Sequence, residues 1–241
     1  MEEGKHDKSE HHTSQDRHWI VAAGALESAQ SYLAGSAGPS APRDGSSEAF
    51  SSSFAAFVEW AIQNRLIRAE AEFPFLKRIP DASGEEHEAW FDEDSNLWFK
   101  LTYRNHFGLA WGRSGSATAG EYVSRLLLQN TFFEDDIRLV AVLNCGGALR
   151  VLTSQPHIMG EPPSQEDIVS WFGALGFSKI AIGSGIAWYH RAENLLVGDA
   201  HEGNIIKTPN GCMVPIDLNL IHPTGKLLKW VTAASAEPAA N

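Results

Sequence analysis

One stretch near the C-terminus constrains the fold most strongly: "VGDAHEGNIIKTPNGCMVPIDLNL", residues 197–220. It contains Asp199, then Asn204 five residues later, and Asp217 thirteen residues after that. Apolar runs typical of short strands lead into both aspartates. The pattern indicates a fold that directs two carboxylates and an amide to one place.

These three groups suit the transfer of phosphate from ATP to a hydroxyl. Mg²⁺ bridges the phosphates and prefers oxygen ligands, such as a carboxylate and an amide carbonyl. A further carboxylate must orient the acceptor hydroxyl and take its proton. The spacing, which is that of protein-kinase-like folds, predicts Asp199 as this base and Asn204 and Asp217 as metal ligands. A "TPNG" turn (208–211) would join the two strands between them.

The bulk properties limit the partners that the chain can bind. Its 241 residues carry a formal net charge of −11, which argues against binding nucleic acid or an anionic membrane through a general positive field. No apolar run reaches the roughly 20 residues that span a bilayer, and residues 1–19 lack the apolar core of a secretory signal. Cys145 and Cys212 alone provide no disulfide framework. We therefore expect a soluble, cytoplasmic protein.

Residues 1–50 differ in composition from the rest of the chain. The first 18 residues are polar and charged, and residues 34–53 are rich in Gly, Ser, Pro and Ala. Such a segment buries too little to offset its ordering entropy, so we expect a flexible, disordered tail that can be deleted, with at most a short helix over 19–34. Its histidines are expected to be solvated and not to bind a metal; they are His6, His11, His12 and His18.

From residue 51 onward, helical and strand-like apolar patterns alternate. The patterns predict helices over 53–67, 120–133 and 164–177, hairpins over 89–103 and 137–156, and short strands after that. This order predicts a two-lobed α+β fold that divides near residues 154–157. We expect a nucleotide-binding N-lobe with its preceding helix at 51–154, a C-lobe at 155–230 and a flexible end at 231–241.

Seven motifs, taken in order, resemble the kinase-like domain of polyvalent proteins from phages and mobile elements. The loop at 198–204 is also similar to the catalytic loop of aminoglycoside and choline phosphotransferases, because His201 and Gly203 follow that version. The resemblance covers residues 83–220 and implies a serine/threonine/tyrosine kinase-like fold. The motifs are "SGEEHEAWF", "WFKLT", "GEYVSRLLLQN", "TSQPHIMGE", "LGF", "GDAHEGN" and "PID".

The resemblance implies which residues hold the phosphates. Lys100 would contact the α- and β-phosphates, and Glu121, 21 residues later, would pair with Lys100. The turn "SGEEH" (83–87), which contains Gly84 and His87, would replace a glycine-rich phosphate loop, although it has a single glycine.

The resemblance also implies the adenine site, the cofactors and the acceptor. Adenine would lie against a hinge that includes Ser154, Gln155 and Pro156, and His201 would act in the catalytic loop. ATP with Mg²⁺ or Mn²⁺ would be the cofactor, and the acceptor would be a hydroxyl of a protein or a small molecule. Because 24 residues follow Asp217, the C-lobe would be small.

Two other functions remain open at this point. A degenerate, non-catalytic module would bind nucleotide or a partner, and the single glycine of turn 83–87 together with the small C-lobe favours it. A metal-dependent hydrolase could use Asp199, His201 and Asp217 as ligands, but it would leave Asn204 without a task. The complete set of a lysine, a base and two metal ligands favours an active phosphotransferase.

Overall fold

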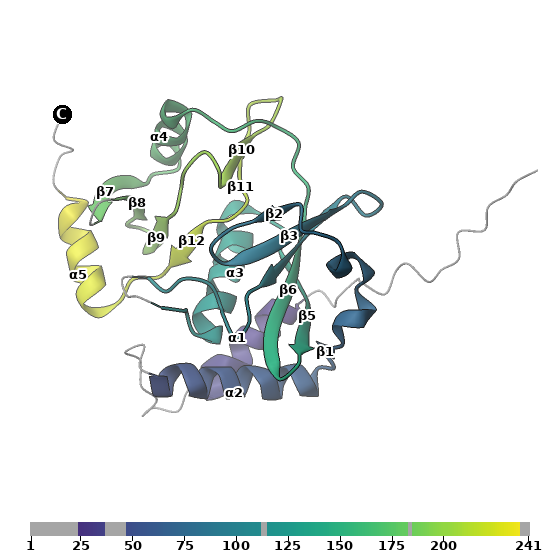
Figure 1. Cartoon of the computed structure of the whole chain (residues 1–241). Coiled ribbons are helices and arrows are strands. Elements are labelled where there is room, and N and C mark those ends of the chain that lie inside the picture. The colour runs from purple at the N-terminus through teal and green to yellow at the C-terminus, as the bar shows by residue number, and fades with distance from the viewer. Residues whose placement is uncertain (1–23, 37–46, 112–114, 183–184, 237–241) are drawn as a thin grey trace, which may run out of the picture.

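The computed structural model of the chain describes residues 24–36, 47–111, 115–182 and 185–236. The fold is mixed α+β and two-lobed, as predicted, and helix α3 (Ala119–Phe133) lies where the lobes meet (Figure 1). The predictions for residues 1–23, the histidine cluster included, fall outside the described residues. Within the ranges above, no helix has the length and apolar character needed to cross a membrane.

A six-stranded sheet forms the N-terminal lobe, in the order β1-β5-β6-β4-β3-β2. Both predicted hairpins are confirmed, β3–β4 and β5–β6. Gly146 and Gly147, in the second hairpin turn, have φ of 66° and 89°, which tight turns between strands of this twist require. The strands are β1 (Ile67–Arg68), β2 (Ala82–Ser83), β3 (His87–Asp92), β4 (Leu97–Thr102), β5 (Arg138–Cys145) and β6 (Ala148–Pro156).

Each face of this sheet is covered by different elements. Helices α1 (Ala25–Ser36), α2 (Ser47–Gln63) and α3 cover one face, where Phe57 and Trp60 belong to the buried cluster. The 3₁₀ turns η1 (Glu70–Glu72) and η2 (Pro74–Lys77) cover the other face, where Phe73 packs on Phe99 and Leu152 of the sheet. Successive side chains of a strand point to opposite faces, and because both faces are covered, β5 is buried continuously from Leu139 to Leu143.

Helix α1 overlaps the short helix predicted over 19–34, but it packs on the body of the protein, which corrects the prediction of a flexible tail for residues 24–36. It buries Leu26, Ala29 and Leu33 among residues of α2, α3 and the sheet, and Trp60 Nε1 donates a hydrogen bond to Ser28 Oγ (3.1 Å). These apolar positions follow a helical stripe that the composition of the segment obscures. Residues 24–36 are therefore part of the N-terminal core.

Replacing Leu26 by alanine is expected to destabilise the whole protein by about 2–5 kcal/mol, because a buried leucine is lost and a cavity is left. Urea unfolding measures this change. Ser31→Ala, on the exposed side of the same helix, is the matched control and should stay within about 0.5 kcal/mol of the wild type. Equal unfolding midpoints for the two variants would show that α1 does not dock in solution.

The C-terminal lobe holds a four-stranded sheet in the order β12-β9-β8-β7, with helices α4 and α5 beside it. The capping box of Ser164 and Asp167 begins α4, as predicted. A separate hairpin, β10–β11, is joined by the predicted "TPNG" turn. The elements are α4 (Gln165–Ala174), β7 (Ser178–Ile182), β8 (Gly185–His190), β9 (Leu195–Gly198), β10 (Ile205–Lys207), β11 (Met213–Pro215), β12 (Asn219–Ile221) and α5 (Gly225–Ala234).

The predicted flexible end at 231–241 is corrected in its described part. Helix α5 extends through Ala234, and Val231 is fully buried against Leu196 and Ile180 of the C-terminal sheet. Residues 237–241 lie outside the described residues. The apolar face of α5 closes the outer side of this lobe.

The segment after β6 crosses to the C-terminal lobe and lies against β10. Glu161 and Lys207 exchange backbone hydrogen bonds of 3.0 and 2.8 Å. A Cβ atom on Gly160 would lie 2.4 Å from the Lys207 carbonyl oxygen, so glycine is required for this close approach. The crossing segment and β10 thereby form one wall of the space between the lobes.

Candidate functional site

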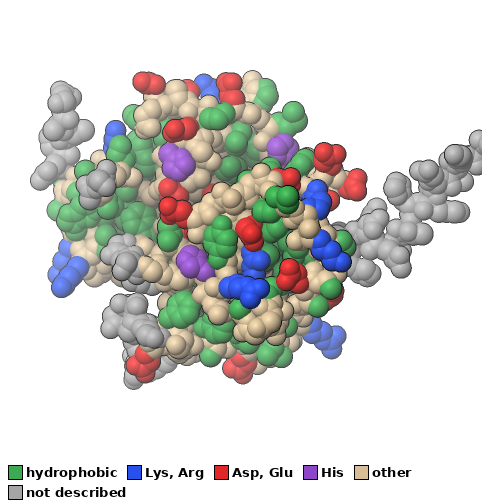
Figure 2. Space-filling view, viewed as in Figure 1, with side chains coloured by type: hydrophobic (Ala, Val, Ile, Leu, Met, Phe, Trp, Pro, Cys, Tyr) green, Lys and Arg blue, Asp and Glu red, His purple; other side chains and the backbone are tan. Residues whose placement is uncertain are grey.

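A cavity of about 740 Å³ lies between the two lobes. Its walls come from turn 83–87, strand β4, the segment after β6, the loop between β9 and β10, and the segment after β11. Figure 2 shows acidic, basic and histidine side chains among apolar ones across the middle of the face where the lobes meet. Nine of the eleven predicted site residues line this cavity: Gly84, His87, Lys100, Gln155, Pro156, Asp199, His201, Asn204 and Asp217.

The loop that follows β9 presents Asp199 and Asn204 to the cavity. Asp199 has a φ of 58°, a left-handed conformation that turns the chain sharply at the strand end. Asn204 Nδ2 donates to the Asp199 carbonyl oxygen and to its Oδ2, both at 2.9 Å. The five-residue spacing therefore closes a loop on itself and sets the two side chains next to each other.

His201 braces the same loop. Its Nδ1 accepts a hydrogen bond from the Gly203 N–H (3.0 Å), and its Nε2 lies 3.3 Å from Asp199 Oδ1. Because Nδ1 is the acceptor, the ring proton is on Nε2 and faces Asp199. With both ring nitrogens engaged in this way, His201 orients Asp199 and is poorly placed to serve as a metal ligand.

Lys100 and Asp217 meet on the other side of the cavity. Lys100 Nζ lies 3.7 Å from Asp217 Oδ2 and donates to the Ile216 carbonyl oxygen at 2.6 Å. The Ile216 N–H in turn donates to the Asn204 carbonyl oxygen (2.8 Å). Lys100 and Asn204 are thus both hydrogen-bonded to the backbone of Ile216, the residue before Asp217.

The two aspartates have opposite pKa shifts. Partial desolvation raises the pKa of Asp199, whose side chain is 62% exposed, above its ordinary value, against the opposing effects of His201 and Asn204. Burial also acts to raise the pKa of Asp217, but Lys100, His87 and Arg125 outweigh it, so this pKa lies below its ordinary value. Asp217 is therefore held as an anion, whereas Asp199 is the more basic of the two carboxylates.

Turn 83–87 is fixed by an ion pair that the sequence did not reveal. Glu86 and Arg125 form two hydrogen bonds, 2.9 and 2.5 Å long, and their side chains are 15% and 6% exposed. The Leu109 N–H also donates to Glu86 Oε1 (2.7 Å). Burial acts to raise the pKa of Glu86, but the Arg125 guanidinium holds it below its ordinary value. The turn is anchored to α3 by charge and not left mobile by glycines.

His87 follows this ion pair and is buried beneath the cavity. Its Nε2 lies 3.1 Å from the Tyr122 hydroxyl, and its Nδ1 lies 4.0 Å from both Glu86 and Asp217. Burial lowers the pKa of His87 to about 4, so the ring is neutral at pH 7. Glu86, His87 and Asp217 present ligand atoms within 4.8 Å of one another, but Arg125 already neutralises Glu86.

Glu121 does not take the position predicted for it. Its carboxylate accepts hydrogen bonds from the Thr118 N–H (2.7 Å) and hydroxyl (3.1 Å), which completes a capping box at the start of α3. No ion pair joins Lys100 to Glu121 in the part of the chain that the structure describes. One turn later, Arg125 is the α3 side chain that reaches the cavity.

Ser154 also differs from its prediction. It is buried opposite Phe99 in the β4–β6 ladder and is not among the residues that line the cavity. In a strand, neighbouring residues point to opposite faces, so Gln155 reaches the cavity where Ser154 does not. The wall extends instead through His157 and Ile158.

Sequence reasoning missed Glu86 and Arg125 as a pair. The available signal was that Arg125 occupies a buried position of α3, one helical turn after Glu121 and next to apolar Leu126. A buried arginine needs a carboxylate partner, and turn 83–87 offers two glutamates. Their identity as partners depends on tertiary structure.

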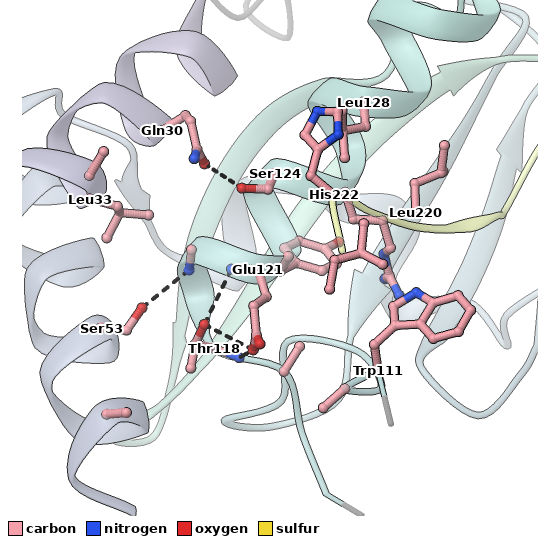
Figure 3. A pocket seen from close by; sticks show the side chains of 18 of the residues that line it. Gln30, Leu33, Ser53, Trp111, Thr118, Glu121, Ser124, Leu128, Leu220 and His222 are labelled. Carbon is pink, nitrogen blue, oxygen red and sulfur yellow. Dashed lines mark hydrogen bonds between the residues drawn. The ribbon is translucent and has the colours of Figure 1, made fainter. Parts of the chain in front are cut away.

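A second cavity of about 490 Å³ lies between α1, α2, α3 and β12 (Figure 3). On its walls, Ser124 Oγ donates to Gln30 Oε1 (3.0 Å) and the Gly120 N–H donates to Ser53 Oγ (3.2 Å). Of the predicted site residues, only Glu121 lines this second cavity. Arg125 lines both cavities. These contacts tie the two N-terminal helices to α3.

Comparison with known proteins places the chain in context. The model of the family described as "Serine/Threonine/Tyrosine Kinase found in polyvalent proteins" matches residues 55–221. This match begins within α2 and ends at β12, so it contains every residue that lines the first cavity. No curated protein and no solved structure matches the chain significantly.

Proposed function

The chain belongs to the family of serine/threonine/tyrosine kinases found in polyvalent proteins, and on this premise we propose that it is an ATP-dependent phosphotransferase. It transfers the γ-phosphate of ATP to a hydroxyl of a protein or a small molecule. The observation that carries the proposal is that Lys100, Asp199, Asn204 and Asp217 line one cavity between the lobes. A volume of about 740 Å³ is within the usual range for sites of this kind.

Different side chains of the cavity bind the phosphates and the adenine of the nucleotide. Lys100 supplies a positive charge to the phosphates, which lie beside turn 83–87. Ala89, Trp98 and Ile206 offer apolar surface to adenine next to Gln155, at the end of β6. In this arrangement turn 83–87 orders the phosphates through its fixed position, since it has one glycine and cannot wrap them with successive backbone N–H groups.

The donor set at the phosphate end fits Mg²⁺ or Mn²⁺. Asp217 is an anion, and Asn204 uses its Nδ2 for Asp199, which leaves its carbonyl oxygen for a metal. Hard divalent cations prefer such oxygen ligands. When bound, the ion neutralises charge on the phosphates.

Asp199 is the residue proposed to act on the acceptor. His201 Nε2–H and Asn204 Nδ2–H hold its carboxylate from two sides. Its raised pKa makes it a better proton acceptor than an ordinary aspartate. Asp199 thus orients the acceptor hydroxyl and takes its proton as the phosphoryl group is transferred.

A non-catalytic nucleotide-binding module is the second candidate function. One observation favours it: Glu86 binds turn 83–87 to Arg125, so the turn cannot close over phosphates as a glycine-rich loop does. The two candidates share the binding of Mg·ATP and differ in turnover.

The protein is expected to bind ATP in the presence of Mg²⁺ or Mn²⁺, and Lys100→Met should abolish most of this binding. At a ligand concentration of about 100 Kd, binding adds about 2.7 kcal/mol to the stability, which raises the Tm by about 5–10 °C for a chain of this size. Differential scanning fluorimetry and calorimetry measure the two effects.

Lys207→Met is the matched control, because Lys207 forms its ion pair with Asp167 outside the cavity lining. It should bind ATP as the wild type does. No thermal shift and no binding heat with millimolar Mg·ATP would refute the kinase proposal. Binding without phosphotransfer to any acceptor, and without ATP hydrolysis, would favour the non-catalytic module.

A further inference from the structure

Gln129 of α3 holds the backbone on both sides of Asp217. Its side chain is buried, with 2% of the residue exposed. Its Nε2 donates to the Pro215 carbonyl oxygen (3.4 Å), and its Oε1 accepts from the Leu218 N–H (3.2 Å). The Gln129 side-chain amide is thus hydrogen-bonded to the backbone before and after Asp217, the proposed metal ligand.

The same amide connects this segment to the other side of the cavity. Gln129 Nε2 donates to Asp135 Oδ2 at 2.7 Å, and Gln155 Nε2 donates to the same oxygen at 2.5 Å. Gln155 lies at the end of β6 and lines the cavity. A buried chain of hydrogen bonds therefore runs from the wall at Gln155, through Asp135 and Gln129, to the backbone that flanks Asp217.

The hydrogen-bonding capacity of Gln129 is matched to this arrangement. A glutamine side chain has two N–H donors and one carbonyl acceptor. The donors are used by Asp135 and Pro215, and the acceptor is used by Leu218. A buried polar network in which the members are satisfied specifies a single geometry, so this residue defines where the Asp217 backbone lies.

The two backbone groups of Ile216, next to Asp217, are held by residues of the proposed site itself. Ile216 donates to Asn204 and accepts from Lys100. Gln129 contacts none of the reacting groups. It holds the Pro215 carbonyl and the Leu218 N–H, the backbone groups on either side of Ile216 and Asp217. Partners of this kind, which orient a ligand without touching the metal, typically change metal affinity or activity by about 10–100-fold when removed.

We propose that Gln129 is a positioning residue, which fixes Asp217 for metal binding and, through Asp135, ties it to the nucleotide wall at Gln155. The inference rests on the proposed function of this site. It adds a residue whose effect is on the metal ligand and not on the phosphates or the acceptor.

The test replaces Gln129 by methionine, which keeps the length of the side chain and removes its amide. The apparent affinity for Mg²⁺ or Mn²⁺, titrated into protein with ATP, is expected to weaken about 10–100-fold, while binding of ATP without metal should stay nearly unchanged. Exchange of the Leu218 amide hydrogen should become faster, because its acceptor is lost. This last readout does not depend on nucleotide.

Asn130→Leu is the matched control. Asn130 is the next residue of α3, and its side chain bonds the Ile137 carbonyl oxygen (2.8 Å) and N–H (2.9 Å), away from Asp217. This variant should lower the Tm but leave the metal affinity unchanged. Equal losses of metal affinity in both variants, or a Gln129→Met protein that loses only stability, would overturn the positioning role.

If Gln129→Met folds poorly, the proposal can be tested with Gln129→Glu, alone and combined with Asp135→Asn. In Gln129→Glu the carboxylate faces Asp135, so like charges meet and metal affinity should fall. Adding Asp135→Asn removes the like charge and supplies a donor to the new carboxylate. The affinity should then recover in part, because the carboxylate still cannot donate to the Pro215 carbonyl oxygen; no recovery at all in a folded double variant would count against the proposal. If the wild type itself binds no Mg·ATP, the proposed function fails and this role fails with it, whereas loss in Gln129→Met alone leaves the function intact.

Discussion

Phosphotransfer by the Asp199→Asn variant is expected to fall about 10²–10⁴-fold, the usual contribution of a general base. Asparagine keeps the shape and the hydrogen-bonding reach of the side chain but cannot accept the proton. The affinity for Mg·ATP should change little, because Asp199 is proposed to act on the acceptor and not to bind the metal. Turnover is measured with a panel of protein and small-molecule acceptors, or as slow ATP hydrolysis.

Asp217→Asn is the contrasting variant in the same experiment. It removes a carboxylate that Lys100 and Arg125 keep charged, so metal-dependent ATP binding should weaken. Wild-type turnover by Asp199→Asn would exclude Asp199 as the base. Equal losses of Mg·ATP binding in both variants would contradict the proposal that Asp217 binds the metal and Asp199 acts only on the acceptor.

Arg125→Met is expected to lower the free energy of unfolding by about 3–5 kcal/mol, because it leaves the buried Glu86 carboxylate without its partner. The two side chains are 6% and 15% exposed, and the pair anchors turn 83–87 to α3. Chemical unfolding measures the loss. Nucleotide affinity should fall as well, since the turn that borders the cavity loses its anchor.

Two comparisons make this prediction specific. Adding Glu86→Gln to Arg125→Met removes the unpaired charge and should recover most of the stability. Arg138→Met breaks an exposed pair with Asp136, whose side chains are 47% and 53% exposed, and should cost no more than about 1 kcal/mol. A double variant as unstable as Arg125→Met would mean that Arg125 acts through its packing on Tyr122 (5.3 Å from its ring) and not through the ion pair.

Local features of the sequence predicted much of the fold. The capping box at Ser164 requires only residues three apart, and the β3–β4 and β5–β6 hairpins join strands that are neighbours in sequence. The loop between Asp199 and Asn204 is likewise closed by contacts five residues apart. Hydrogen bonds of short range depend on the identity of nearby residues, so a pattern in the chain reports them.

Helix α1 and Glu121 show where local patterns fail. The sequence predicts a short helix over 19–34 within a flexible tail, but not that this helix packs on the body, where Leu26 shares a buried cluster with Phe57 and Trp60 of α2. Glu121 is suitably spaced for Lys100, but the nearer Thr118 takes its carboxylate as a helix cap. Spacing in the sequence does not show whether Glu121 binds Thr118 or Lys100, because this choice depends on the geometry of the fold.

By itself, the sequence determined the family, and the spacing of Asp199, Asn204 and Asp217 predicted that these three side chains would lie at one place, the cavity that they line. Tertiary structure alone decided what holds that set in place. Gln129 binds Leu218 across 89 positions of the chain, and Arg125 binds Glu86 across 39. The reason is physical: buried polar groups must find partners wherever packing brings them, and the cost of leaving them unpaired selects contacts that no local pattern records.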